Sequence, residues 1–293
     1  MTKRLFISAL AAGACFVGVA HAEPFSQLVA FSGALSDTGN FHAESGKNLP
    51  EPFYQNRSSN GPVAVEELAR WLGLKAEPSL HLIGKPGGTN FAVADALAGG
   101  HGPHDLPAQI NAYLARGGGK ADPKALYFLF IGGNDVIKAV MEMDEAKSKT
   151  ILDEAVTGIE TQTHRLVAAG ATTIFMPDFI DVGASPALLA YGPDAAARGT
   201  RLSHYFNDTF NAMQKKIDDG SFRLIRWSFD DFVNDLRRNG SGFGLTNATE
   251  ACLNVGKARC NVDHFVYLTP EYPTARVHQM LGAAMAVGIL TRN

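Results

Sequence analysis

The sequence lacks the features that mark several broad classes of protein. Basic residues form no cluster, and the net charge of −3 provides no positive surface for nucleic acid or for an anionic membrane. No internal repeat and no Pro- or Ser-rich linker divides the 293 residues, so we expect one domain. The composition is otherwise that of a globular protein, with 46% hydrophobic residues available for a core.

The sequence also lacks an apolar run long enough to span a membrane. Leu5 to Ala20 is apolar, but it is shorter than the roughly 20 residues that a spanning helix needs. It follows Lys3 and Arg4 and precedes the small-x-small site Ala20-His21-Ala22, which is the pattern of a cleaved export signal. We therefore predict a signal peptide at residues 1–22, a mature domain at residues 23–293, a periplasmic or extracellular location and no transmembrane segment after cleavage.

Cysteine is scarce as well: there are three, and Cys15 leaves with the predicted signal. Cys252 and Cys260 remain, and an exported protein meets an oxidising compartment, so we predict a local disulfide. Zinc is the alternative, but two cysteines without suitably spaced histidines make a weak site. His101 and His104 lie in a Gly-rich stretch that we interpret as a solvated loop, so we predict no metal.

Apolar runs rich in β-forming residues alternate with helical patterns along the chain. We predict strands at Gln27–Phe31, Pro78–Ile83, Ala125–Ile131, Thr172–Met176 and Phe222–Trp227. We predict helices at Pro62–Leu72, Thr150–Ala169, Arg201–Ile217 and Pro273–Leu290. Strands this apolar are buried on both faces, as in parallel sheets, and their alternation with helices predicts a doubly wound α/β sandwich. Ligands of such folds bind beyond the carboxyl ends of the strands.

Four segments stand at the ends of predicted strands or before the last helix. They are Phe31 to Asn40, Gly88 to Ala92, Ile131 to Asp135, and Phe265 to Thr274 with His278 after it. Together and in this order they resemble the GDSL, or SGNH, family of esterases and lipases, over nearly the whole mature chain. The resemblance implies a three-layer α/β/α sandwich with about five parallel strands in flavodoxin-like order. It also implies a hydrolase that acts on ester bonds.

The first segment shows what stands in the place of the family's nucleophile. In the family it reads Phe-Gly-Asp-Ser-Leu-Ser-Asp-Thr-Gly-Asn, and Leu35 to Asn40 match this pattern completely. In that register the nucleophilic serine falls on Ala34, and the aspartate before it falls on Gly33. A methyl group cannot attack a carbonyl carbon, so Ala34 supplies no nucleophile.

The last segment differs from the family at both other triad positions. The family reads Asp-x-x-His-Pro-Thr with a second His six residues later, and Pro273-Thr274 and His278 set the register. The family's histidine then falls on Tyr272 and its aspartate on Thr269. A phenol with a reference pKa of about 10 is a poor base at neutral pH, and threonine carries no charge to stabilise an imidazolium. We predict no intact catalytic triad, and we expect His278 to be a packed helix residue.

The loops that stabilise an anion in the family are kept. Gly88 and Asn134 match its oxyanion-hole glycine and asparagine, which would direct a backbone N–H and a side-chain amide at developing negative charge. The alternative is that both residues persist because their loops need that turn chemistry. We keep ligand binding and loop structure as equal interpretations of the pair.

Two functions follow from the sequence. The first is an exported, non-catalytic member of the family that uses the cleft at Ala34, Gly88, Asn134 and Tyr272 to bind an acylated lipid or glycan, or that serves as an interaction module. The second is an active ester hydrolase with a relocated nucleophile. Its candidate nucleophiles are Ser32 and Ser36, and its candidate base is His264 of the pair Asp263-His264. Neither function requires a cofactor.

Overall fold

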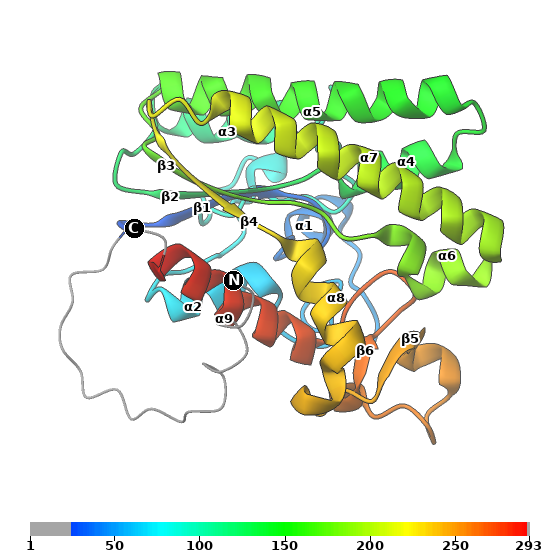
Figure 1. Ribbon diagram of the computed structural model, residues 1–293. Coiled ribbons are helices and arrows are strands. Elements are labelled where there is room, and N and C mark those ends of the chain that lie inside the picture. Colours follow the sequence, from blue (N-terminus) through cyan, green and yellow to red (C-terminus); the bar gives the residue numbers. More distant parts are fainter. Residues whose placement is uncertain (1–24, 292–293) are drawn as a thin grey trace.

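The structure, a computed structural model, describes residues 25–291, so the predicted signal peptide at residues 1–22 lies outside it. Its centre is a parallel sheet in the order β1-β2-β3-β4, within which every residue of β1, β2 and β3 is buried (Figure 1). Burial on both faces is why these strands are unbroken apolar runs in the sequence. The strands are β1 (Leu28–Ser32), β2 (Leu126–Phe130), β3 (Thr173–Pro177) and β4 (Arg223–Trp227).

The strand predicted at Pro78–Ile83 is wrong, because the second half of this segment is a 3₁₀ helix (His81–Ile83). Leu80 has a left-handed φ of 55°, and its N–H donates to Asn40 Oδ1, so the chain turns at this residue. The edge beside β1 is occupied instead by the segment around Asn90, which takes the place of a fifth strand. Its hydrogen bonds to β1 run from Ala30 N–H to Thr89 O and from Phe91 N–H to Ala30 O.

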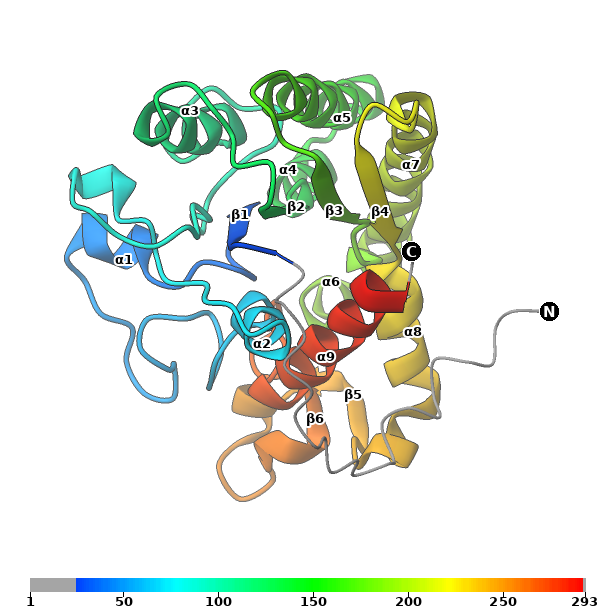
Figure 2. The same ribbon diagram turned by 90° about the vertical axis from the view of Figure 1, so that its left-hand side faces the viewer.

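Helices cover both faces of the sheet and complete the three predicted layers (Figures 1 and 2). Alternate residues of β2 point to opposite faces, so Tyr127 packs in one core and Phe128 in the other. The helices of the first face are α3 (Leu106–Arg116), α4 (Gly133–Met141), α5 (Glu145–Ala168) and α7 (Pro193–Ile217). Those of the second face are α2 (Ala64–Trp71), α8 (Phe229–Asn239) and α9 (Ala275–Thr291). The short helices α1 (Asn40–Ser45) and α6 (Pro186–Ala190) lie in loops.

Helices α2 and α9 pack closely because Gly282 presents no side chain between them. A Cβ at Gly282 would lie 2.4 Å from Glu67 Cβ, inside van der Waals contact. One turn earlier on α9, His278 is fully buried, and its Nδ1 accepts the backbone N–H of Ala64 at the start of α2 (3.1 Å). The prediction that His278 is a packed helix residue is confirmed.

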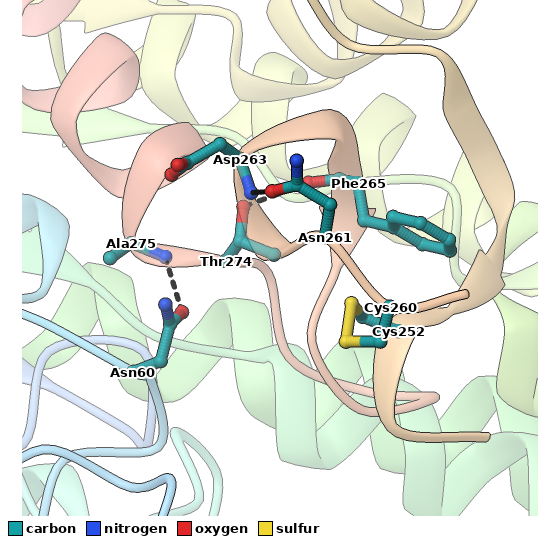
Figure 3. The surroundings of a disulfide bond; sticks show 8 residues. All are labelled: Asn60, Cys252, Cys260, Asn261, Asp263, Phe265, Thr274 and Ala275. Atoms are coloured by element: carbon teal, nitrogen blue, oxygen red, sulfur yellow. Dashed lines mark hydrogen bonds between the residues drawn. A yellow bond between two sulfur atoms is a disulfide. The ribbon is translucent and has the colours of Figure 1, made fainter. Parts of the chain in front are cut away.

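A small lobe between α8 and α9 carries the cysteines (Figure 2). It contains the pair β5 (Asn247–Ala251) and β6 (Phe265–Tyr267), and Cys252 is bonded to Cys260 in the connection between them. The predicted disulfide is therefore confirmed. Figure 3 shows that the Asn60 side chain accepts the backbone N–H of Ala275 beside this lobe, which ties the segment before α2 to the start of α9.

Candidate functional site

A cavity of about 260 Å³ opens beyond the carboxyl ends of β1, β2 and β3, where ligands of doubly wound folds bind. Its walls come from the loop after β1, the N-terminus of α4, the β3–α6 connection and the segment between β6 and α9. Most of the wall is apolar, including Leu35, Phe130, Ile137, Phe179 and Ile180. The structure thus brings together three of the four segments identified in the sequence.

Asp37 holds the loop after β1 in place. Its buried carboxylate accepts N–H bonds from residues 39–41 at the start of α1 and from Ala94 in the neighbouring loop. Burial raises the pKa of this carboxyl above its usual range, and the N–H bonds oppose that rise. Asp37 therefore ties the loop after β1 to the loop that contains Ala94.

Tyr272 lines the cavity together with Ala34, as the sequence register predicts. Burial raises the pKa of its phenol above the usual value, a hydrogen bond with the Ser58 side chain partly opposes this, and the nearby carboxylates of Glu271 and Asp95 add to the rise. The phenol therefore stays protonated at neutral pH and cannot accept a proton from a nucleophile.

Thr269 shapes the turn that carries Tyr272. Its Oγ1 accepts the backbone N–H groups of Glu271 (3.3 Å) and Tyr272 (3.0 Å), and it donates to the Glu271 carboxylate (3.2 Å). This is a serine/threonine turn, in which the side chain substitutes for a backbone acceptor. Thr269 thus supports the loop, and it offers no charge to a base.

The serines that line the cavity donate their hydroxyl hydrogens to backbone carbonyls. Ser32 Oγ donates to Phe130 O (2.5 Å), and Ser185 Oγ donates to Val182 O (2.6 Å). No histidine lines the cavity within the described residues 25–291. Neither serine therefore has a base to accept its proton.

The other residues of the relocated-nucleophile hypothesis are not brought together. Ser36 is buried beside a separate small apolar hollow next to Phe128 and Trp227, and His264 is exposed on the disulfide lobe. A serine–histidine hydrogen bond does occur, between Ser79 Oγ and His81 Nδ1 (2.6 Å). Ser79 is fully buried and lies outside the cavity lining, so this pair is not a nucleophile with its base.

Asn134 lines the cavity, but its amide is engaged. Its Nδ2 donates to Ala94 O (3.0 Å) and to Ala96 O (2.8 Å), which accounts for both amide hydrogens. Gly33 lies beside this amide, and a Cβ at residue 33 would be in ordinary van der Waals contact with Asn134 Nδ2, at 3.4 Å. In this geometry the side chain braces the loop at residues 94–96 and holds no free donor for an oxyanion.

Gly88 lies away from the cavity. Its N–H donates to Pro78 O (2.8 Å), and its carbonyl accepts Arg116 Nη1 (2.7 Å), so its backbone groups are satisfied elsewhere. The neighbour of Asn134 is instead the loop at residues 94–96, six residues further along the chain. Sequence reasoning missed this loop, although it directly follows the matched segment Gly88 to Ala92 and is rich in alanine, which allows close approach.

We expect the Asn134→Asp variant to lose about 2–3 kcal/mol of unfolding free energy, because a carboxylate would face two carbonyl oxygens that each lose a donor. Urea denaturation at neutral pH measures this loss. The matched control is Asn111→Asp, whose exposed side chain accepts from Arg165 and should change stability by no more than about 0.5 kcal/mol. Equal stability of the two variants would show that Asn134 is not bracing the loop.

The histidines of the Gly-rich stretch do not assemble a metal site. His104 Nε2 lies 2.7 Å from Glu44 Oε2, while His101 is exposed. Within residues 25–291 no three His, Cys, Asp or Glu side chains are grouped as a metal ion would need.

Comparison with known proteins gives concordant matches. A model of the GDSL-like lipase/acylhydrolase family matches residues 29–284. The chain is similar to the phosphatidylcholine-sterol acyltransferase of Aeromonas hydrophila, with 27% identity over 258 residues, 85% of this chain and 72% of that protein. It is similar to Lipase 1 of Photorhabdus luminescens, with 32% identity over 194 residues, 64% of this chain and 28% of that protein. A solved catalytic mutant of Axe2, an acetylxylan esterase from Geobacillus stearothermophilus, aligns with a TM-score of 0.48 at 10% identity, covering 90% of this chain and 93% of that chain.

Proposed function

The chain belongs to the GDSL-like lipase/acylhydrolase family, and we propose that it is an exported member that binds an acyl or ester ligand without hydrolysing it. The ligand is an acylated lipid or glycan whose acyl part enters the cavity beyond β1, β2 and β3. One observation carries the proposal: Ala34 and Tyr272 line the cavity at the positions where the resembled family has its nucleophile and its base.

The substitutions remove more catalysis than the rest of the site replaces. Losing the serine or the histidine alone lowers kcat of a serine protease by about 10⁶-fold. An oxyanion hole and substrate binding without a triad retain a rate acceleration of about 10³–10⁴-fold over the reaction in water. Because both hydrogens of the Asn134 amide are bound to backbone carbonyls, we place this chain below that range.

The apolar wall supports an acyl ligand. Each 100 Å² of apolar ligand surface removed from water contributes about 2.5 kcal/mol, so a short acyl chain in this cavity binds without any charged contact. The names of similar proteins, a lipase and a phosphatidylcholine-sterol acyltransferase, accord with a ligand of this class. The Tyr272 hydroxyl is a hydrogen-bond donor of the wall that would orient the ester by donating to its carbonyl oxygen.

Hydrolysis by a relocated serine has less support. Ser32 donates to a backbone carbonyl, Ser36 lies outside the cavity lining, and His264 is exposed on another lobe. A working nucleophile and its base lie within hydrogen-bonding reach of each other. None of these pairs meets that condition.

Export is part of the proposal. The disulfide between Cys252 and Cys260 accords with an oxidising compartment, and the N-terminal sequence has the pattern of a signal peptide. Within residues 25–291 no helix has the length and hydropathy needed to cross a bilayer.

We expect the purified protein to bind methyl octanoate, measured by calorimetry, while 4-nitrophenyl butyrate is hydrolysed no faster than in buffer. A fluorophosphonate probe should leave the folded protein unlabelled, because no serine that lines the cavity in residues 25–291 has a histidine beside it. Ala34→Phe places a ring inside the cavity and should lower the affinity for methyl octanoate at least about tenfold.

The matched control is Ala197→Phe, on the exposed side of α7, which should bind methyl octanoate like the wild type. Ester turnover by the wild type that Ala34→Phe abolishes would overturn the proposal. So would labelling of Ser32 or Ser36 by the fluorophosphonate.

A further inference from the structure

The charge at the cavity is negative and comes from one side chain. Glu271 is the single charged residue that lines the cavity in the described part of the chain, and its carboxylate forms no ion pair with another described residue. Thr269 Oγ1 donates to this carboxylate (3.2 Å) and also accepts the backbone N–H of Glu271. The turn therefore positions an uncompensated negative charge at the wall of an apolar cavity.

A second carboxylate, that of Asp95, acts on the same part of the cavity wall. Glu271 and Asp95 both act on the Tyr272 phenol electrostatically, and both disfavour its ionisation. Asp95 is exposed in the loop whose carbonyls hold Asn134. An anionic ligand group near Tyr272 would meet the same repulsion as the phenolate does.

Aromatic rings line the same cavity as Glu271. Phe130 and Phe179 are stacked with their centroids 5.5 Å apart, and both line the cavity together with Tyr272. The face of an aromatic ring attracts a cation, most strongly where water is excluded. Rings and one carboxylate in the same wall are the groups that recognise quaternary or protonated ammonium.

One feature of the cavity favours an anion, and it is the weaker one. Gly133 and Asn134, the first two residues of α4, lie at the wall, and a helix N-terminus carries about half a positive charge. The Asp135 carboxyl lies in the same first turn and opposes this positive charge, and both hydrogens of the Asn134 amide are already donated. The net charge presented to a ligand therefore remains negative.

We propose that the cavity selects an amphiphile whose polar end carries an ammonium group, with the apolar chain inside and the cation between Glu271 and the Tyr272 ring. This inference rests on the proposed function, because it adds a headgroup preference to the acyl-binding cavity. It makes Glu271 a specificity-determining residue that binds the headgroup and takes no part in any chemical step.

Three ligands with the same octyl chain test the inference: octyltrimethylammonium, octyl sulfate and octyl glucoside, each titrated calorimetrically below its micelle concentration. We expect octyltrimethylammonium to bind about tenfold more tightly than octyl sulfate at low salt, because a unit charge near a carboxylate at a protein surface has an interaction of that size. Glu271→Gln should bring the affinities for octyltrimethylammonium and octyl sulfate to within about threefold of each other. Glu154→Gln, an exposed carboxylate on α5, should leave the ratio of these affinities unchanged.

The outcomes separate this inference from the proposed function. Binding of octyl glucoside together with equal or tighter binding of octyl sulfate overturns the ammonium preference and leaves acyl binding intact. A tenfold preference that persists in Glu271→Gln overturns the role of Glu271. Absence of binding by all three ligands overturns both proposals.

Discussion

Hydrolysis of a short-chain nitrophenyl ester is expected to rise by about 10³-fold when Ala34→Ser, Thr269→Asp and Tyr272→His are combined in one chain. The first and third positions line the same cavity, and Thr269 Oγ1 lies 3.0 Å from the backbone nitrogen of Tyr272. A complete triad contributes about 10⁶-fold in a serine protease. We expect about 10³-fold of this to be missing, because the Asn134 amide is bound to two carbonyls and supplies no oxyanion donor.

Each partial reversion should stay close to the wild-type rate. The members of a triad act as a unit, so a serine without a base, or a base without a serine, contributes little. The double variant Ala34→Ser with Thr269→Asp is the matched control, since it introduces the nucleophile and the acid but keeps the phenol. A fluorophosphonate should label the triple variant and leave this double variant unlabelled.

A folded triple variant without turnover would contradict the prediction. The Tm of the variant and its affinity for methyl octanoate show whether the fold and the cavity survive the three substitutions. If both survive and the rate does not rise, the loops have moved away from a catalytic geometry. The ligand-binding proposal would then stand, because it does not depend on a restorable triad.

The unfolding free energy of the wild type is expected to fall by about 3 kcal/mol more than that of His278→Asn between pH 7 and pH 4. Burial lowers the pKa of His278 to about 3, while an exposed histidine has a pKa of 6.5. As the pH falls below 6.5, His278 is therefore protonated in the unfolded chain and stays neutral in the folded chain. The stability that the neutral imidazole provides is present above pH 6.5 and is lost as the pH falls toward 3.

The surroundings of the His278 ring explain why it resists protonation. Its Nδ1 accepts the Ala64 N–H, so the ring proton is on Nε2, which is buried without a hydrogen-bond partner among the described residues. Asparagine offers an oxygen at a position similar to Nδ1 and does not titrate, which makes His278→Asn the matched comparison. Urea denaturation at several pH values gives both curves.

Other buried groups also change their protonation between pH 7 and pH 4, and their effects on the stability of the fold have opposite signs. Burial lowers the pKa of His81 to about 4, which adds to the loss of stability in acid. Burial raises the pKa of Asp135 and of Asp178 to about 6, so these carboxyls stabilise the fold as the pH falls through that value. Subtracting the stability curve of His278→Asn from that of the wild type removes these shared contributions. Parallel curves would contradict the burial of a neutral His278.

Much of the fold is predictable because its pattern is local. The four strands of the sheet lie within one residue of their predicted positions. In β1, β2 and β3 the reason is burial on both faces, which makes the strand an apolar run in the sequence. The four predicted helices start up to eight residues from their predicted positions, as with α7, which begins at Pro193 instead of Arg201. An exposed first turn has no apolar periodicity to mark it. The helices α3, α4 and α8 are not predicted from the sequence.

The edge of the sheet shows where local patterns fail. Pro78–Ile83 has the composition of a strand, but Asn40 captures the Leu80 N–H and the chain turns. The segment around Asn90 pairs with β1 only through an isolated bridge, and its apolar part, Phe91 to Val93, is shorter than the other strands of the sheet. Both outcomes depend on contacts between segments about 40 to 60 residues apart.

The sequence by itself determined the family and the disulfide partners, because both depend on which residues stand at given places in short motifs. The placement of the triad positions on Ala34, Thr269 and Tyr272 stays a prediction from those motifs. Tertiary structure alone decided that the Asn134 amide binds the carbonyls at residues 94 and 96, that Gly88 lies away from the cavity, and that Glu271 is the charge at its wall. The physical reason is that these hydrogen bonds and this unpaired charge depend on which distant segments pack against each other. The spacing of residues along the sequence does not specify those contacts.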